Sequence, residues 1–85
     1  MFLDVASELV VEILSPRDTA IGLTEKLREY FATGVRLGWV IDPRARSVYA
    51  YRALTDVREF LETDRLPGED VLAGLEVPVA SLFED

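Results

Sequence analysis

The chain has 85 residues, enough for one small domain, and its hydrophobic content of 49% is that of a globular protein with a core. It contains neither cysteine nor histidine, which excludes disulfide bonds, thiol catalysis, imidazole acid–base chemistry and zinc sites built on these residues. The net charge of −7 is that of a poor general nucleic-acid binder, because affinity for phosphate depends on lysine and arginine.

The charge is distributed unevenly along the chain. Residues 1–52 contain seven acidic and seven basic residues, whereas residues 53–85 contain nine acids and only two bases, Arg58 and Arg65. The balanced half weakens the objection to nucleic-acid binding without removing it. The sequence has no signal-peptide pattern, no cysteine and no apolar run of about 20 residues, so we expect a cytoplasmic protein without a membrane span.

The first predicted element is a strand over residues 9–14, which read LVVEIL. Both of its faces are largely apolar, and Glu12 is the one charged residue in it. This pattern is typical of a central strand that is covered on both sides. Ser15 and Pro16 end the strand.

A helix is predicted from about Thr19 to Thr33. Asp18 or Thr19 is the candidate N-cap, and Gly34 is the natural residue to end the helix. Gly22 lies inside it and costs about 1 kcal/mol relative to alanine, so the first turn is expected to be loose. Four residues recur at the spacing of a helix face that packs on a core: Leu23, Leu27, Tyr30 and Phe31.

Three more strands are predicted at residues 37–41, 47–52 and 57–62. The helix connects the first of these to residues 9–14, which predicts a parallel, right-handed β-α-β unit. A turn at residues 42–46 predicts antiparallel pairing for the strands that follow. Scattered apolar residues after Leu66 predict an irregular tail that packs back on the sheet. The predicted fold class is α/β (α+β), a single domain over residues 1–85 with a mixed β-sheet in β-α-β-β-β order.

The candidate chemistry depends on Glu12 and on Lys26, the only lysine in the chain. A carboxylate on an otherwise apolar strand face is costly unless it is paired or binds a metal. Lys26 flanks the apolar stripe of the predicted helix, so its amine can reach over the sheet. In phosphodiester hydrolysis, such a carboxylate holds a divalent ion and a nearby ammonium orients water or offsets charge on phosphate. Ligation by oxygen alone favours magnesium or manganese.

Each of these residues also has an ordinary structural interpretation. Glu12 could lie near the edge of the sheet or pair with an arginine. Lys26 could form a solvated pair with Glu29, three residues further on, worth only about 0.2–0.5 kcal/mol. Turn arginines and strand aromatics could contact nucleic acid, but the former are usually solvated and the latter usually pack in cores: Arg44, Arg46, Trp39, Tyr49 and Tyr51.

Several sequence blocks carry a resemblance to a known family. In chain order they read LVVEILSP, KLREY, GVRLGWVIDP, RSVYAYR and, near the end, DVLAGLEVPVASLF. Their order and spacing resemble the C-terminal half of the Uma family of restriction-endonuclease-like proteins, which have the PD-(D/E)XK nuclease fold. The resemblance covers roughly residues 7–83. It implies the C-terminal half of a restriction-endonuclease-like fold and a metal-dependent DNA endonuclease activity.

The resemblance also implies roles for particular residues. Glu12 matches the acidic position of the (D/E)XK half-motif, which makes it a catalytic residue and a ligand of magnesium or manganese. Leu14 stands where the simple motif has its lysine, and Lys26 on the following helix is implied as the displaced catalytic lysine. Tyr30 matches an aromatic position of that helix, where packing is the expected role.

The sequence departs from the family pattern at its start. Family members have an N-terminal half that supplies the motif aspartate, so the resemblance implies a truncated member that is incomplete or inactive as an isolated chain. Asp4 echoes that aspartate, but a tight turn after it would place it opposite Leu9 and about 10 Å from Glu12. Glu8, on the same strand as Glu12, is about 13 Å away from it by the same rise per residue.

Two hypotheses of different classes follow. In the first, the chain is a metal-dependent endonuclease whose second carboxylate comes from a dimer partner or another polypeptide, with DNA as the substrate. In the second, it is a catalytically silent remnant that acts as a self-associating or partner-binding module. Both lead us to expect a homodimer or higher homo-oligomer, because an open sheet edge and an exposed apolar face need to be covered.

Overall fold

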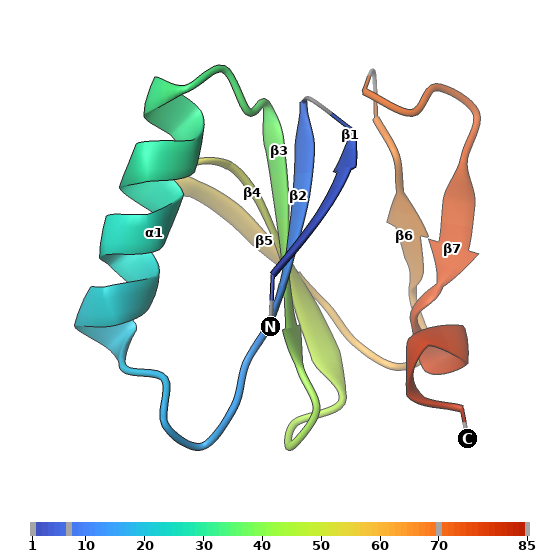
Figure 1. Cartoon of the computed structure of the whole chain (residues 1–85). Helices are drawn as coiled ribbons and strands as arrows, with labels where there is room; N and C mark the ends of the chain where they lie inside the picture. Colours follow the sequence, from blue (N-terminus) through green and yellow to red (C-terminus); the bar gives the residue numbers. More distant parts are fainter. Residues whose placement is uncertain (1, 7, 70, 85) are drawn as a thin grey trace.

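The centre of the molecule is a mixed sheet of five strands in the order β1-β2-β3-β4-β5 (Figure 1). Strands β2 and β3 are parallel and are joined through helix α1, and every other neighbouring pair in this sheet is antiparallel. The strands span Phe2–Ala6, Leu9–Ile13, Leu37–Asp42, Ser47–Ala53 and Asp56–Phe60. The predicted α+β class and its β-α-β-β-β order are confirmed, and β1 adds a strand that the sequence analysis did not predict.

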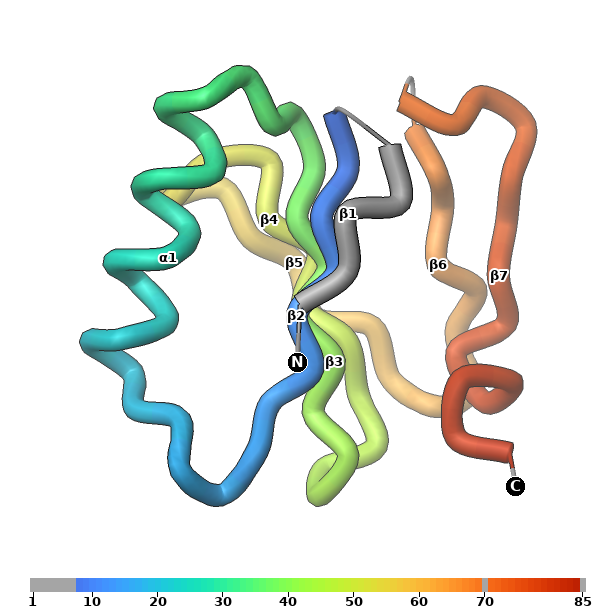
Figure 2. The backbone as a smooth tube through the Cα atoms, viewed as in Figure 1, coloured from blue at the N-terminus to red at the C-terminus, as the bar shows by residue number. Residues whose placement is uncertain are grey.

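The computed structural model describes residues 2–6, 8–69 and 71–84. Helix α1 (Ala20–Ala32) covers one face of the sheet, and the C-terminal segment covers the other, as the backbone trace also shows (Figure 2). This segment was expected to be irregular, which is wrong in part. It forms a separate antiparallel pair, β6 (Arg65–Pro67) and β7 (Glu76–Pro78), followed by a 3₁₀ helix, η1 (Val79–Phe83).

The main core lies between the sheet and this C-terminal segment. Alternate residues of the strands point into it, as the period of two predicts, and the burial of their apolar surface stabilises the fold by about 25 cal/mol per Å². Four tail residues pack against the cluster, so the expected packing of the tail on the sheet is confirmed: Val71, Leu72, Val77 and Phe83. Trp39 is part of the core and only 7% exposed, which removes it as a platform for stacking on bases.

The opposite face of the sheet carries α1. Leu27 is the one described residue of this helix that is fully buried, and Gly38 of β3 gives it room, because a Cβ at Gly38 would already lie 3.4 Å from Leu27 Cδ2. The helix begins at the Thr19 cap, whose Oγ1 accepts a hydrogen bond from the Gly22 N–H at 3.0 Å. It ends before Gly34, which has a φ of 104°. No helix in the described part of the chain is long and apolar enough to cross a membrane.

Candidate functional site

Glu12 lies in the interior of the sheet, on the face covered by α1. Its strand, β2, has a neighbour on each side, and Glu12 is paired in register with Val40 of β3 and Phe2 of β1. Glu12 is only 2% exposed. The alternative that Glu12 lies at an edge of the sheet is therefore wrong, and the carboxylate must be compensated inside the protein.

The compensation comes from α1. Lys26 Nζ lies 3.0 Å from Glu12 Oε1, and the Tyr30 hydroxyl donates to Glu12 Oε2 at 3.5 Å. Lys26 and Tyr30 are four residues apart, so both side chains project from one side of the helix toward the same carboxylate. The structure thus brings together the two predicted site residues, and the partner of Glu12 is Lys26 rather than an arginine.

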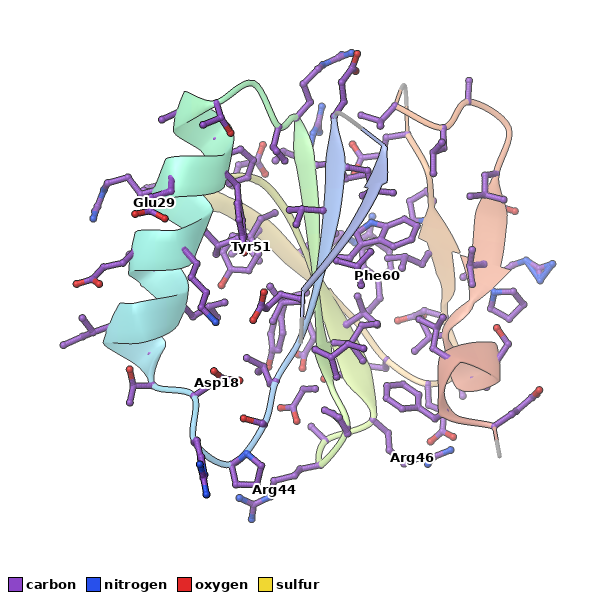
Figure 3. All side chains as sticks on the ribbon, viewed as in Figure 1. Asp18, Glu29, Arg44, Arg46, Tyr51 and Phe60 are labelled. Carbon is purple, nitrogen blue, oxygen red and sulfur yellow. The ribbon has the colours of Figure 1, made fainter. Side chains whose placement is uncertain are left out.

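Asp18 is a member of this cluster that the sequence analysis treated only as a candidate helix cap. Its Oδ1 lies 3.8 Å from Lys26 Nζ, and the Ser15 N–H donates to its Oδ2 at 2.7 Å. In Figure 3 Asp18 lies in the segment that leads into α1. Because Thr19 is the cap, the Asp18 carboxylate is available to the turn and to Lys26.

The electrostatics of the cluster follow from these contacts. The Glu12 carboxylate raises the pKa of the Lys26 ammonium, through the hydrogen bond it accepts and through its charge. The backbone hydrogen bond from Ser15 holds the pKa of Asp18 below its usual value of 3.8. Burial raises the pKa of the Tyr30 hydroxyl, and the charge of Glu12 adds to the effect. At neutral pH the ammonium is charged and the phenol is a neutral donor.

The register of β1 corrects the expected position of Asp4. Asp4 is paired with Val10 rather than Leu9, and the pairing is irregular between Asp4 and Ala6. Asp4 is therefore two residue pairs from Glu12 instead of three, or about 7 Å along the strands. Glu8 is ion-paired with Arg36 at 2.9 Å, which directs its carboxylate to another contact.

The donor set around Glu12 consists of oxygens alone. Among the described residues there is no group of three or more side chains that could together hold a metal ion. Magnesium, however, is commonly bound through one or two carboxylates, with water and substrate phosphate completing its shell. Glu12 offers a buried negative charge that already requires a cation beside it. The oxygen donors at the site are thus of the kind that suits magnesium or manganese, and Glu12 is the residue that would hold such an ion.

The other candidate contacts to nucleic acid have structural roles or lie elsewhere. Arg46 donates two hydrogen bonds to Glu62, at 3.0 and 2.6 Å, and its guanidinium lies 5.1 Å from the centre of the Phe83 ring. Arg44 is exposed in the turn before β4. A hollow of about 730 Å³ lies beside the C-terminal half of α1, and its lining includes neither Glu12 nor Lys26. Three arginines line it: Arg28, Arg36 and Arg52.

Comparison with known proteins identifies the family. The model of the Uma2 family, described as putative restriction endonucleases, matches residues 2–80. The chain belongs to the Uma2 family. A crystal structure described as a putative nuclease of the DUF820 group from Anabaena variabilis is similar, with a TM-score of 0.76 and 26% sequence identity over 89% of this chain. No curated protein matches the chain at a significant level.

This Uma2 chain spans 43% of the length of the nuclease-like protein from Anabaena variabilis. The family match confirms the resemblance inferred from the sequence blocks, and the structural match confirms a nuclease-like fold. The catalytic roles of Glu12 and Lys26 stay predictions.

Proposed function

We propose that this Uma2 chain provides a metal-dependent DNA endonuclease site, in which Glu12 is the metal ligand and Lys26 stabilises charge on the substrate phosphate. The observation that supports it most is the buried Glu12 carboxylate with the ammonium of the only lysine at 3.0 Å. A charge pair on an apolar sheet face gives little net stability, since the cost of desolvation offsets the attraction. Charged side chains are almost never fully buried unless they are paired, so this pair marks a candidate functional site.

Each residue of the cluster has its own role in the proposed reaction. Glu12 would hold magnesium or manganese, which supplies Lewis acidity and a water of lowered pKa when it is bound. Lys26 is 46% exposed, so its ammonium can contact a phosphodiester while the Glu12 carboxylate stays buried. A lysine side chain is protonated at neutral pH, so the Lys26 ammonium can offset the negative charge that develops on the phosphate oxygens. Tyr30 fixes the second oxygen of Glu12 from the helix.

A second carboxylate ligand for the metal is expected at such a site, and we consider two alternative sources for it. Asp4 is two residue pairs from Glu12 in the register of β1 and β2. The alternative is a carboxylate from a partner chain. The variant Asp4→Asn tests the first source in the cleavage assay described next: loss of cleavage assigns the second carboxylate to Asp4, and unchanged cleavage excludes Asp4.

The test is nicking of supercoiled plasmid DNA by the purified chain with magnesium or manganese, and with a chelator as the blank. Wild type is compared with Glu12→Gln and Lys26→Met, and Glu29→Gln serves as the matched control because it removes a charge from the same helix outside the cluster. We expect ion-dependent nicking by wild type and the control, and background from the other two variants. Equal background from all four proteins would falsify the proposal.

A second candidate function is a self-associating module without catalysis. The outer edge of β5 supports it, since four of its five residues are exposed, and Val57, on this strand, and Leu61, just beyond it, are 43% and 53% exposed. A strand edge of this kind can pair with another chain. Light scattering behind a sizing column tests the idea: a dimer or higher oligomer is expected, and a monomer at high concentration would rule it out.

A further inference from the structure

The turn between β2 and α1 carries a carboxylate to which the proposed chemistry assigns no role. Asp18 Oδ1 lies 3.8 Å from Lys26 Nζ, and Glu12 Oε1 lies 3.0 Å from the same nitrogen. The ammonium therefore lies between two carboxylates, one buried and one 25% exposed. Among the described residues, Lys26 forms ion pairs with these two and not with Glu29, the partner that helical spacing favoured.

The backbone holds the Asp18 carboxylate in place. The Ser15 N–H donates to Asp18 Oδ2 at 2.7 Å, and the Asp18 N–H donates to the Ser15 carbonyl oxygen at 3.0 Å. The turn is attached to the sheet, because the Leu14 N–H donates to the Ile41 carbonyl oxygen at 2.9 Å. One carboxylate oxygen of Asp18 thus anchors the side chain, and the other faces Lys26.

The Lys26 side chain, in contrast, is partly open to solvent. It is 46% exposed, and a lysine ammonium sits on a flexible four-carbon stem. A divalent cation on Glu12 would compete with the ammonium for the same carboxylate, because the two positive charges repel each other. Without a second acceptor the ammonium would then move into solvent, away from the phosphate.

We propose that Asp18 is a positioning residue that keeps the Lys26 ammonium beside the site when the Glu12 carboxylate binds a divalent cation. This inference rests on the proposed function of Glu12 and Lys26. Asp18 itself contacts neither the cation nor the substrate in this scheme. Its contribution is to fix the place of the ammonium.

The first test needs no catalytic activity. Because Lys26 is the only lysine, protein labelled with ¹⁵N-lysine gives a single side-chain Nζ resonance. Magnesium chloride is added to wild type, Asp18→Asn and Glu29→Gln, whose folding is checked by their backbone amide spectra. Asp18→Asn keeps an oxygen for the Ser15 N–H but removes the charge that faces Lys26, and Glu29→Gln removes a charge outside the cluster.

We expect the Nζ resonance of wild type and Glu29→Gln to stay observable at saturating magnesium, and that of Asp18→Asn to be lost through fast proton exchange with water. An identical response of Asp18→Asn and wild type would overturn the inference. In plasmid cleavage, we expect kcat of Asp18→Asn to fall about tenfold, as for other residues that orient a catalytic group, with KM unchanged. An unchanged kcat overturns the inference as well.

The two proposals fail in different ways. A wild-type chain that does not cleave DNA refutes the proposed function, and the NMR comparison then decides the role of Asp18 by itself. A wild-type chain that cleaves DNA, together with an Asp18→Asn variant that matches it in either measurement, refutes the positioning role alone.

Discussion

Helix α1 is docked on the sheet mainly through Leu27, and this gives a prediction that can be worked out in magnitude. Leu27 is 2% exposed and lies against Gly38 of the sheet. Replacing a buried leucine by alanine costs about 2–5 kcal/mol, and about 3 kcal/mol is expected here because the helix can settle partly into the space. A domain of this size has about 4–13 kcal/mol of stability, so the loss is a large share of it. The melting temperature should fall by about 10–20 °C.

Scanning calorimetry of Leu27→Ala measures this effect, and Ile21→Ala is the matched control. Ile21 is on the same helix but 74% exposed, so its truncation should change the stability by less than about 0.5 kcal/mol. Equal melting temperatures for the two variants would refute the docking of α1 through Leu27. Because Lys26 is adjacent to Leu27 in the helix, the same result would also undermine the geometry of the site.

Three further predictions concern the charge cluster and the helix end. Lys26→Met should lower the melting temperature more than Glu12→Gln does. The lysine substitution leaves a buried carboxylate without its cation, whereas the glutamate substitution leaves an ammonium that can reach water. The opposite order in calorimetry would contradict the burial of Glu12. The pKa values of Lys26 and Tyr30 are raised above 10.5 and 10.0, so their contribution to stability is full below these values and is lost as pH rises through the folded-state pKa. Urea unfolding at about pH 9 and pH 11 should show this loss of stability in wild type and a smaller loss in Glu12→Gln. Gly34→Ala should lower the free energy of unfolding in urea by about 1 kcal/mol, because the φ of 104° strains any residue with a Cβ. An unchanged free energy of unfolding would mean that the helix ends differently.

Periodicity predicted the central elements because each is long enough to show its repeat. The short apolar run of residues 9–14, bounded by Ser15 and Pro16, and the apolar stripe of α1 gave both elements to within a residue or two at their ends. The strands of the C-terminal segment have three residues each, which is too short for a period of two to be recognised. Strand β1 was missed because its pairing with β2, with an irregular step between Asp4 and Ala6, is a tertiary effect.

The two main residues of the candidate site could be named from the sequence, but their contact could not be predicted. Glu12 on an apolar strand required a partner or a metal, and an arginine partner or a position near the sheet edge was equally open. Lys26 was singled out through the family resemblance and its place beside the apolar stripe of the helix. The role of Asp18 was not predictable in the same way, since its approach to Lys26 depends on the hydrogen bonds of the turn at Ser15 and not on helical or strand spacing. The local sequence, with a serine three residues before an aspartate, is compatible with such a turn but does not specify where the free oxygen points.

We propose above that the buried Glu12 carboxylate, with Lys26 beside it, forms a phosphodiester-cleaving centre. The most direct measurement is the rate of plasmid nicking by Glu12→Gln relative to wild type at saturating manganese, with both proteins shown to be folded. We expect the isosteric loss of this one charge to lower the rate at least about a hundredfold, because it removes a metal ligand. Equal rates for the two proteins would contradict it.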